Sequence, residues 1–314
     1  MRAPDYRQIL DHEVWAYIAR AESFFPPDAA ALSIAEQRRC YNQMCAAFRR
    51  GRPEGVHTRD ESYGGVACRR YEVADADITV IYYHGGGHIM GDLESHDDVC
   101  AEICQRTGYR VVSVDYRLAP ETVFPGCFED AWAAFVGIVQ AWNGVVAVAG
   151  DSAGGNLAAA VAHHARGRID ARIAGQVLIY PALGGDIAQG SYLLHAQAPQ
   201  LSTADMEVYE RLRRGGADIA HGDARFAPLR DADFSHLPLT VLITAECDPL
   251  ASDGEAYRDA VLAAGGKAVW INEAGLVHGY LRARETSQKA AASFDRIVMA
   301  VAGLGRGEWP VLRD

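Results

Sequence analysis

The sequence predicts an α/β fold with a mostly parallel central sheet flanked by helices. Short apolar runs rich in β-branched residues alternate with helix-like segments along the chain, which is typical of a buried parallel sheet. Two of these runs end in glycine-rich turns. The 314 residues, 49% of them hydrophobic, can bury one large core and a smaller cap.

Strands are expected where the apolar runs lie, and helices between them. The expected strands cover residues 64–73, 78–83, 109–115, 145–149, 175–180, 239–244 and 267–272. The expected helices cover residues 96–106, 128–142, 156–162, 254–264 and 285–301. Two further segments, 1–50 and 186–222, are helix-like and contain no expected strand, and Ser202 to Asp205 resembles a helix start.

The turn after the run 145–149 matches the G-x-S-x-G pattern of a nucleophile elbow. It reads Gly150-Asp151-Ser152-Ala153-Gly154. The small residues around Ser152 allow the sharp bend between strand and helix that exposes the hydroxyl group. An ordinary tight turn would also explain the pattern, but here an expected strand precedes it and an expected helix follows it.

The turn after the run 78–83 reads His84-Gly85-Gly86-Gly87. Three glycines leave backbone N–H groups uncovered, so two of them can donate to a carbonyl oxygen that becomes negative. Open α/β sheets bind ligands at the carboxyl ends of their strands, where both turns are expected. Together the two turns predict acyl-transfer chemistry.

A serine nucleophile needs a base and an acid that orients the base, and in α/β-hydrolases these follow in the order Ser, Asp or Glu, His. Asp248 lies just beyond the expected strand 239–244, and His278 lies on a later loop between glycine-containing segments. Glu246 and Asp253 compete with Asp248. Asp253 fits an N-cap of the next helix and Glu246 is expected on the other side of the loop. We therefore expect Asp248 as the acid and His278 as the base.

The motifs resemble those of the hormone-sensitive-lipase family, the bacterial carboxylesterases of the α/β-hydrolase superfamily. The matching segments are 84–91, 115–121, 124–125, 150–156, 248–250 and 278–280. The resemblance implies Ser152, Asp248 and His278 as the catalytic triad. It implies an oxyanion hole formed by the N–H groups of Gly86, Gly87 and Ala153, with supporting motif residues His84, Gly85 and Asp151.

The resemblance also implies a helical cap. Residues 1–50 and 186–222 would form this cap over a catalytic core made of 51–185 and 223–314. They could instead cover only an edge of the sheet. The chain departs from the family pattern at His88, where relatives often have an aromatic residue, and at Ala251-Ser252, where many have Arg-Asp. We expect His88 to pack on the pocket wall and not to take part in catalysis.

The activity implied by the resemblance is serine carboxylesterase activity on short-chain acyl esters, acetyl to about hexanoyl, through an acyl-enzyme. The expected partner is a small-molecule ester. Two alternatives remain open: an amide or formamide hydrolase with the same triad, and a non-catalytic small-molecule receptor on the same fold.

Composition argues against several other functions. The net charge of −11 and the pI near 5.5 disfavour binding to nucleic acid or to an anionic membrane. No apolar run approaches the roughly 20 residues of a membrane span. The N-terminal residues lack the pattern of a secretory signal, and the seven cysteines are an odd number, so we expect a cytoplasmic protein with reduced thiols. A homodimer is left open.

Neither a metal nor a cofactor is expected. His96, Cys100 and Cys104 have the spacing to share one helix face as metal ligands. The neighbouring Val99 and Ile103 favour an ordinary packed helix instead. Phosphate-binding glycine loops of the dinucleotide and Walker types do not occur in the sequence.

Overall fold

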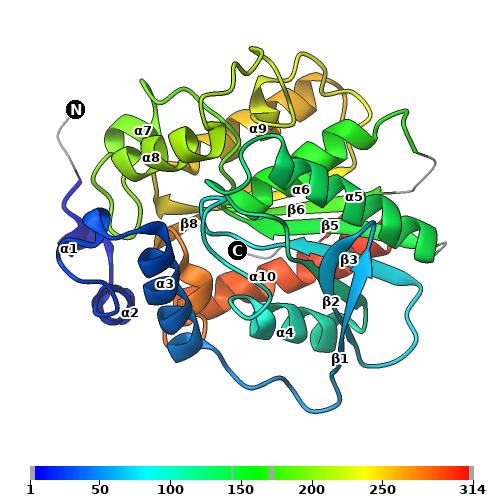
Figure 1. The fold of residues 1–314 in the computed structure, drawn as a ribbon, viewed down its shortest axis with the longest axis horizontal. Coiled ribbons are helices and arrows are strands. Elements are labelled where there is room, and N and C mark those ends of the chain that lie inside the picture. Colours follow the sequence, from blue (N-terminus) through cyan, green and yellow to red (C-terminus); the bar gives the residue numbers. More distant parts are fainter. Residues whose placement is uncertain (1–3, 143, 170–172, 311–314) are drawn as a thin grey trace.

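The centre of the molecule is a single sheet of eight strands among residues 4–142, 144–169 and 173–310, which the computed structural model describes (Figure 1). Its strand order is β1-β2-β4-β3-β5-β6-β7-β8. The strands are β1 (His57–Tyr63), β2 (Val66–Glu72), β3 (Ile78–Tyr83), β4 (Arg110–Val114), β5 (Val145–Asp151), β6 (Ile173–Ile179), β7 (Leu239–Cys247) and β8 (Ala268–Val277). All pairings are parallel except β1 with β2 and β2 with β4. The predicted α/β-hydrolase fold class is confirmed.

Helices cover both faces of this sheet. The α-helices are α1 (Tyr6–Ile9), α2 (His12–Glu22), α3 (Ile34–Phe48), α4 (Asp97–Thr107), α5 (Gly126–Ala141), α6 (Ala153–Ala165), α7 (Ser191–Leu194), α8 (Thr203–Arg214), α9 (Ala251–Ala263) and α10 (Gln288–Gly305). Three short 3₁₀ turns are η1 (Ala29–Ala31), η2 (Pro228–Arg230) and η3 (Tyr280–Ala283). No helix among the described residues is long and apolar enough to cross a bilayer.

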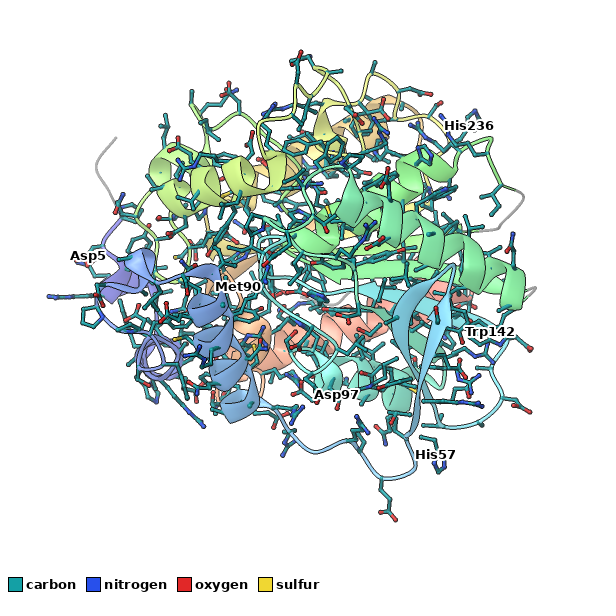
Figure 2. All side chains as sticks on the ribbon, in the orientation of Figure 1. Asp5, His57, Met90, Asp97, Trp142 and His236 are labelled. Atoms are coloured by element: carbon teal, nitrogen blue, oxygen red, sulfur yellow. The ribbon has the colours of Figure 1, made fainter. Side chains whose placement is uncertain are left out.

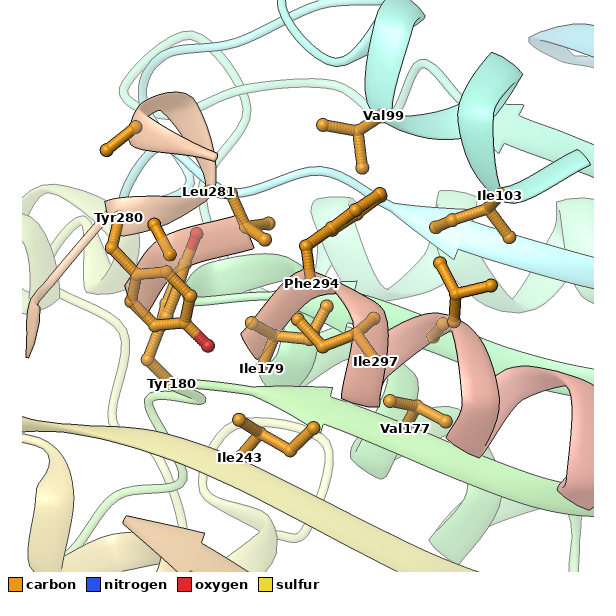
Figure 3. Packing of buried hydrophobic residues seen from close by; sticks show 14 of the residues in the cluster. Val99, Ile103, Val177, Ile179, Tyr180, Ile243, Tyr280, Leu281, Phe294 and Ile297 are labelled. Atoms are coloured by element: carbon orange, nitrogen blue, oxygen red, sulfur yellow. The ribbon is translucent and has the colours of Figure 1, made fainter. Parts of the chain in front are cut away.

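The central strands are apolar at nearly every position because both of their faces are covered. In β3, Val80 and Tyr82 belong to the core beneath α4 and α10, whereas Ile81 and Tyr83 belong to the core beneath α5 and α6. Successive side chains of a strand point to opposite faces, so one continuous apolar run serves both cores. Figure 3 shows the first core, where Phe294 of α10 packs beside strand residues such as Ile179.

The predicted start of the strand at residues 64–73 was wrong. The structure has a hairpin there, with β1 before the turn at Gly64 and Gly65 and β2 after it. The sequence of β1 is mostly polar because it is the outermost strand and most of its residues reach solvent. The strand expected at 267–272 is longer in the structure and continues as β8 to Val277, directly before His278.

Five helices from the two strand-free segments, α1, α2, α3, α7 and α8, gather at one end of the sheet (Figure 1). The predicted helix start at Ser202 is confirmed, since Ser202 and Asp205 form a reciprocal capping box at the beginning of α8. Met90, labelled in Figure 2, packs with Tyr41 of α3 and Tyr209 of α8. The two segments therefore meet above the glycine turn that follows β3.

Candidate active site

Ser152 occupies the bend between the end of β5 and the start of α6. Its backbone has φ 55° and ψ −118°, a strained conformation for a residue with a side chain. The bend depends on Gly154, where a Cβ atom would lie 1.9 Å from the carbonyl oxygen of Tyr83. The strained turn places the Ser152 hydroxyl in the wall of a cavity.

His278 lies between Ser152 and Asp248. Its Nε2 is 2.9 Å from Ser152 Oγ, and its Nδ1 is 2.7 Å from Asp248 Oδ2. The Asp248 carboxylate is fully buried and also accepts from the N–H of Leu250. Because the carboxylate accepts a hydrogen bond, Nδ1 is the nitrogen that donates, which leaves Nε2 to accept from Ser152. The structure thus brings the three predicted side chains into one hydrogen-bonded chain.

The two competing acids bind elsewhere. Glu246 accepts from the N–H of Gly275. The expected N-cap role of Asp253 was wrong, because α9 already begins at Ala251 with Leu250 at its N-cap position. Asp253 instead lies in the first turn of α9 and faces another loop.

The buried carboxylate of Asp253 ties this loop and α7 to α9. It accepts backbone N–H groups of residues 183–185 and the hydroxyl of Tyr192. Burial raises the pKa of Asp253 to about 6, although these hydrogen bonds oppose the shift. Sequence spacing carried no sign of this contact because the loop lies far away in the chain.

The predicted oxyanion donors lie beside Ser152 in the cavity wall. Gly86, Gly87, Ser152 and Ala153 all line the same cavity. Within the described ranges, no protein acceptor is bonded to the N–H groups of Gly86, Gly87 or Ala153. Gly86 has φ 125°, and a Cβ atom there would lie 2.2 Å from the carbonyl oxygen of Met90. The N–H of Ala153 opens α6, whose dipole favours negative charge at that end.

Asp151 joins the two glycine turns beneath the cavity. Its Oδ1 accepts from the Tyr82 hydroxyl at 2.9 Å and from the Gly85 N–H at 2.9 Å. Burial acts to raise the pKa of Asp151, but His96, Arg282 and the Tyr82 hydroxyl outweigh it and hold the pKa well below its usual range. Asp151 is therefore a buried carboxylate that fixes the spacing between the turns.

The two histidines of the first turn are both buried. His84 accepts the Tyr116 hydroxyl at its carbonyl oxygen, and burial lowers the pKa of its ring to about 4. His88 lines the cavity, and burial followed by the charge of Arg213 holds the pKa of its ring well below the usual range. Both rings are neutral at physiological pH. The packing role expected for His88 stays a prediction.

His96, Cys100 and Cys104 lie at or within α4, as expected. The three side chains do not face a common metal site. His96 Nε2 lies 3.3 Å from Asp151 Oδ1, and both cysteines are buried in the apolar core. In the part of the chain that the structure describes, no three His, Cys, Asp or Glu side chains are grouped closely enough to hold a metal ion.

The cavity above Ser152 has a volume of about 770 Å³. We call its sheet side the floor, which consists of Gly86, Gly87, Ser152, His278 and Gly279. We call the opposite side the roof, which consists of the cavity-lining residues of segments 1–50 and 186–222. Prominent roof residues are Tyr17, Tyr41, Met44, Tyr192, Leu201, Met206, Tyr209 and Arg213.

Sequence patterns identified several roof residues only as apolar faces of helices. Tyr17, Tyr41 and Met44 lie in the segment 1–50, which was expected only to be helical, and the hydroxyl groups of the two tyrosines gave no signal of a site. In the structure, the Tyr17 hydroxyl donates to the carbonyl oxygen of Gly279 at 3.0 Å, next to His278. Roof and floor are therefore bonded to one another.

The chain is similar in sequence and fold to known hydrolases. A family described as having the alpha/beta hydrolase fold matches residues 80–282. Esterase LipI of Mycobacterium tuberculosis is 40% identical over 214 residues, which are 66% of this chain and 67% of that protein. An ethyl acetate hydrolase of Pseudomonas putida is 32% identical over 72% of this chain and 73% of its own. The crystal structure of an esterase from the bacterial hormone-sensitive lipase family is 25% identical, with a TM-score of 0.84 over 93% of this chain and 98% of that chain.

Proposed function

Since the chain belongs to the hormone-sensitive-lipase family of alpha/beta hydrolases and is a carboxylic ester hydrolase, we propose that Ser152, His278 and Asp248 form its catalytic triad. The observation that carries this proposal is the unbroken chain of hydrogen bonds from Ser152 Oγ through His278 to Asp248. The Ser152 end of this chain lies in a cavity that is also lined by Gly86, Gly87 and Ala153, whose N–H groups are free of protein acceptors in the described residues.

The reaction proceeds in two steps. His278 Nε2 takes the proton from Ser152 as Oγ attacks the ester carbonyl carbon, and the N–H groups of Gly86, Gly87 and Ala153 bind the oxyanion that forms. Asp248 orients the imidazole and stabilises its cationic form. The tetrahedral intermediate expels the alcohol, which takes its proton from His278. Water then attacks the acyl-enzyme with the same help and releases the carboxylic acid and free Ser152.

The proposed substrates are esters with short acyl chains, from acetyl to about hexanoyl. The cavity, at about 770 Å³, lies in the size range of small-molecule sites and is closed on one side by the helices of the roof. The similarity to an enzyme named ethyl acetate hydrolase supports a short acyl group.

We also infer that residues 1–50 and 186–222 act as a cap that excludes water from the acyl-enzyme. Support comes from Tyr17 of α2 and Tyr209 of α8, which line the cavity together with the floor residues. A Cβ atom at Gly87 would lie 2.8 Å from the ring of Tyr209, so the roof touches the proposed oxyanion hole.

The test is steady-state hydrolysis of p-nitrophenyl acetate, butyrate, octanoate and palmitate by the wild type and by Ser152→Ala. The proposal predicts rates that fall with chain length in the wild type and a loss of about 10⁴-fold or more in the variant with folding retained. An unchanged rate in Ser152→Ala would remove Ser152 as the nucleophile. Equal rates on acetate and palmitate would overturn the short-chain assignment.

A further inference from the structure

Arg282 places a positive charge in the wall of the same cavity. It lies in η3, only four residues after His278, so the two Cα atoms are at most about 14 Å apart. Its side chain is half-buried and lines the cavity beside Tyr41 and His96. Ser152 and Arg282 thus line one cavity, so a substrate bound at Ser152 shares that cavity with the guanidinium group.

The guanidinium group has hydrogen-bond partners but no carboxylate partner. Nη2 donates to the Tyr41 hydroxyl at 2.7 Å, and Nη1 donates to the carbonyl oxygen of Ser95 at 3.1 Å. The Tyr41 ring lies beneath it, with the guanidinium carbon 5.1 Å from the ring centre. Across the described ranges, none of the ion pairs within 4.0 Å involves Arg282. An arginine has five N–H donors, so several remain for a ligand.

This arrangement differs from that of the buried arginines away from the cavity. Arg284, two residues later, pairs with Asp98 and Glu102. Arg69 pairs with Asp60 and Asp97, and Arg110 pairs with Glu72. Carboxylates are abundant, since the chain has 41 acidic residues against 30 Lys and Arg. A buried charge normally has such a partner.

Asp151 is the carboxylate whose charge Arg282 influences, because Arg282 contributes to the low pKa of Asp151. However, Asp151 already accepts from Tyr82 and Gly85 and forms no ion pair with Arg282. Asp151 balances part of the charge of Arg282 across a distance and leaves those N–H donors of Arg282 that bind neither Tyr41 nor Ser95 unoccupied. This partial compensation explains how the guanidinium group is tolerated in the free protein.

Arg213, a more deeply buried arginine of the cavity wall, has a different role. Only 5% of it is exposed, and its guanidinium group donates to the carbonyl oxygen of Phe226 at 3.0 Å and to Asn156 Oδ1 at 3.1 Å. These bonds join α8 to the core. Arg213 therefore serves the packing of the roof. Arg211 and Arg230 also line the cavity but are exposed to solvent, so Arg282 is the lining arginine that combines partial burial with free N–H donors.

We propose that Arg282, together with Tyr41, forms an anion subsite that binds a carboxylate group carried by the ester substrate. The proposal rests on the proposed function, because the same molecule must place its ester carbonyl at Ser152. A guanidinium group binds a carboxylate through two parallel charge-assisted hydrogen bonds. The preferred substrates are thus esters with one free carboxylate a few bonds from the scissile carbonyl, such as half-esters of short dicarboxylic acids.

Acidic side chains at the cavity rim do not prevent this binding. They are Glu22, Asp205, Glu207 and Glu210. All four are exposed to solvent, where water and salt screen their charges. The positive charge of Arg282 lies deeper, where screening by water is weaker.

The test compares pairs of esters that differ only in charge. Monoethyl succinate and monoethyl adipate are each compared with the isosteric primary amide of the same ester, and acetoxyacetate is compared with acetoxyacetamide for a carboxylate on the alcohol side. The wild type is expected to favour the anion by about tenfold or more in kcat/KM in at least one pair. A wild-type ratio of one or less in all three pairs overturns the subsite.

Two variants of Arg282 and one control variant test whether Arg282 causes the preference for the anionic ester. Arg282→Met is expected to lower the anion-to-amide ratio about tenfold, and Arg282→Lys to retain part of it. Arg39→Met removes a charge from an exposed position of α3 outside the cavity and is expected to leave the ratio within about twofold. A ratio unchanged in Arg282→Met overturns the proposal. Using a ratio removes any general loss of activity that follows from altered packing.

Failure of the subsite and failure of the proposed function give different results. Normal hydrolysis of the neutral amide-bearing esters without a preference for the anions would overturn only the subsite. Absence of turnover on every ester, neutral and anionic, would overturn the proposed triad and the subsite with it.

Discussion

The floor of the cavity is formed by residues that directly follow strands of the sheet, whereas the roof is formed by helices from two segments far apart in the chain. Ser152 follows β5, His278 follows β8, and the glycine turn follows β3. Adjacent parallel strands fix the relative positions of these turns through backbone hydrogen bonds. The roof contacts the floor mainly through side chains, such as the Tyr17 hydroxyl on Gly279.

We infer that this difference separates the chemistry, proposed for the floor, from the selection of the substrate, proposed for the roof. A shift of a single atom in the floor alters the alignment of the reacting groups, and the rate falls steeply. A change in the roof alters which molecules fit and how firmly the helices are held. We therefore expect substitutions in the floor to change kcat strongly and those in the roof to have smaller effects.

The largest effect is expected from His278→Ala, which removes the proposed base from the floor. The kcat on p-nitrophenyl butyrate should fall by about 10⁴-fold to 10⁶-fold, since neither proton transfer has another group to carry it. Circular dichroism should show a folded protein. His57→Ala is the matched control, because His57 is exposed on β1 at the far end of the molecule (Figure 2). A variant that kept a tenth of the wild-type kcat would contradict the proposed role.

Gly86→Ala perturbs the proposed oxyanion donors of the floor and leaves all three triad side chains in place. The added Cβ atom would lie 2.2 Å from the carbonyl oxygen of Met90, so the turn must move. We expect kcat to fall by about 10²-fold to 10³-fold. Gly51→Ala is the control, since a Cβ atom there meets nothing within 4 Å. If kcat for Gly86→Ala matched that for Gly51→Ala, this turn would not bind the oxyanion.

Asp253→Asn tests whether the buried carboxyl group of Asp253 links the core to α7. The test uses pH, because the raised pKa of this group should make the free energy of unfolding depend on pH. The folded protein holds the pKa of Asp253 at about 6 instead of the usual 3.8, so it binds a proton more tightly than the unfolded chain does. Stability from this group is present at low pH and is lost as the pH rises through 6. The wild type should lose about 2 kcal/mol of unfolding free energy relative to the variant between pH 4.5 and 7.5. Urea titrations that gave the same difference at both pH values would refute the assignment.

The smallest effect is expected from Tyr17→Phe, which removes one bond between roof and floor. Loss of the 3.0 Å hydrogen bond to Gly279 should lower the free energy of unfolding by about 1 kcal/mol. The kcat on p-nitrophenyl butyrate should change less than tenfold because Tyr17 touches no group of the triad. A loss of 10³-fold in kcat would show that the roof takes part in the chemistry, and the comparison between the two regions would then fail.

The sequence predicted the floor well because its residues are set by local patterns. Ser152 and the glycines at 85–87 each follow an apolar strand, and the required chain order then leads to Asp248 and His278. The contact between Ser152 and His278, which are 126 residues apart in the chain, could be foreseen only because parallel strands end at a common edge. The hairpin strand β1 was missed, since a solvent-exposed edge strand has no apolar run to reveal it.

The roof was predicted only as helices. Nothing in the spacing of Tyr17 or Tyr41 shows that their hydroxyl groups reach the loop after His278, since this depends on how α2 and α3 pack against η3. The role of Asp253 was misjudged for the same reason, because its partners lie about 70 residues away along the chain. Arg282 drew no notice in the sequence, since only the structure shows that it lacks a carboxylate partner.

The most direct test of the proposed triad is covalent labelling of the nucleophile. The wild type and His278→Ala would be treated with diethyl p-nitrophenyl phosphate, and the site of phosphorylation would be located by mass spectrometry of peptides. The account predicts one diethylphosphoryl group per chain, on the peptide that contains Ser152, formed rapidly in the wild type and far more slowly in the variant. Labelling at a different residue, or equal labelling rates in the two proteins, would contradict it.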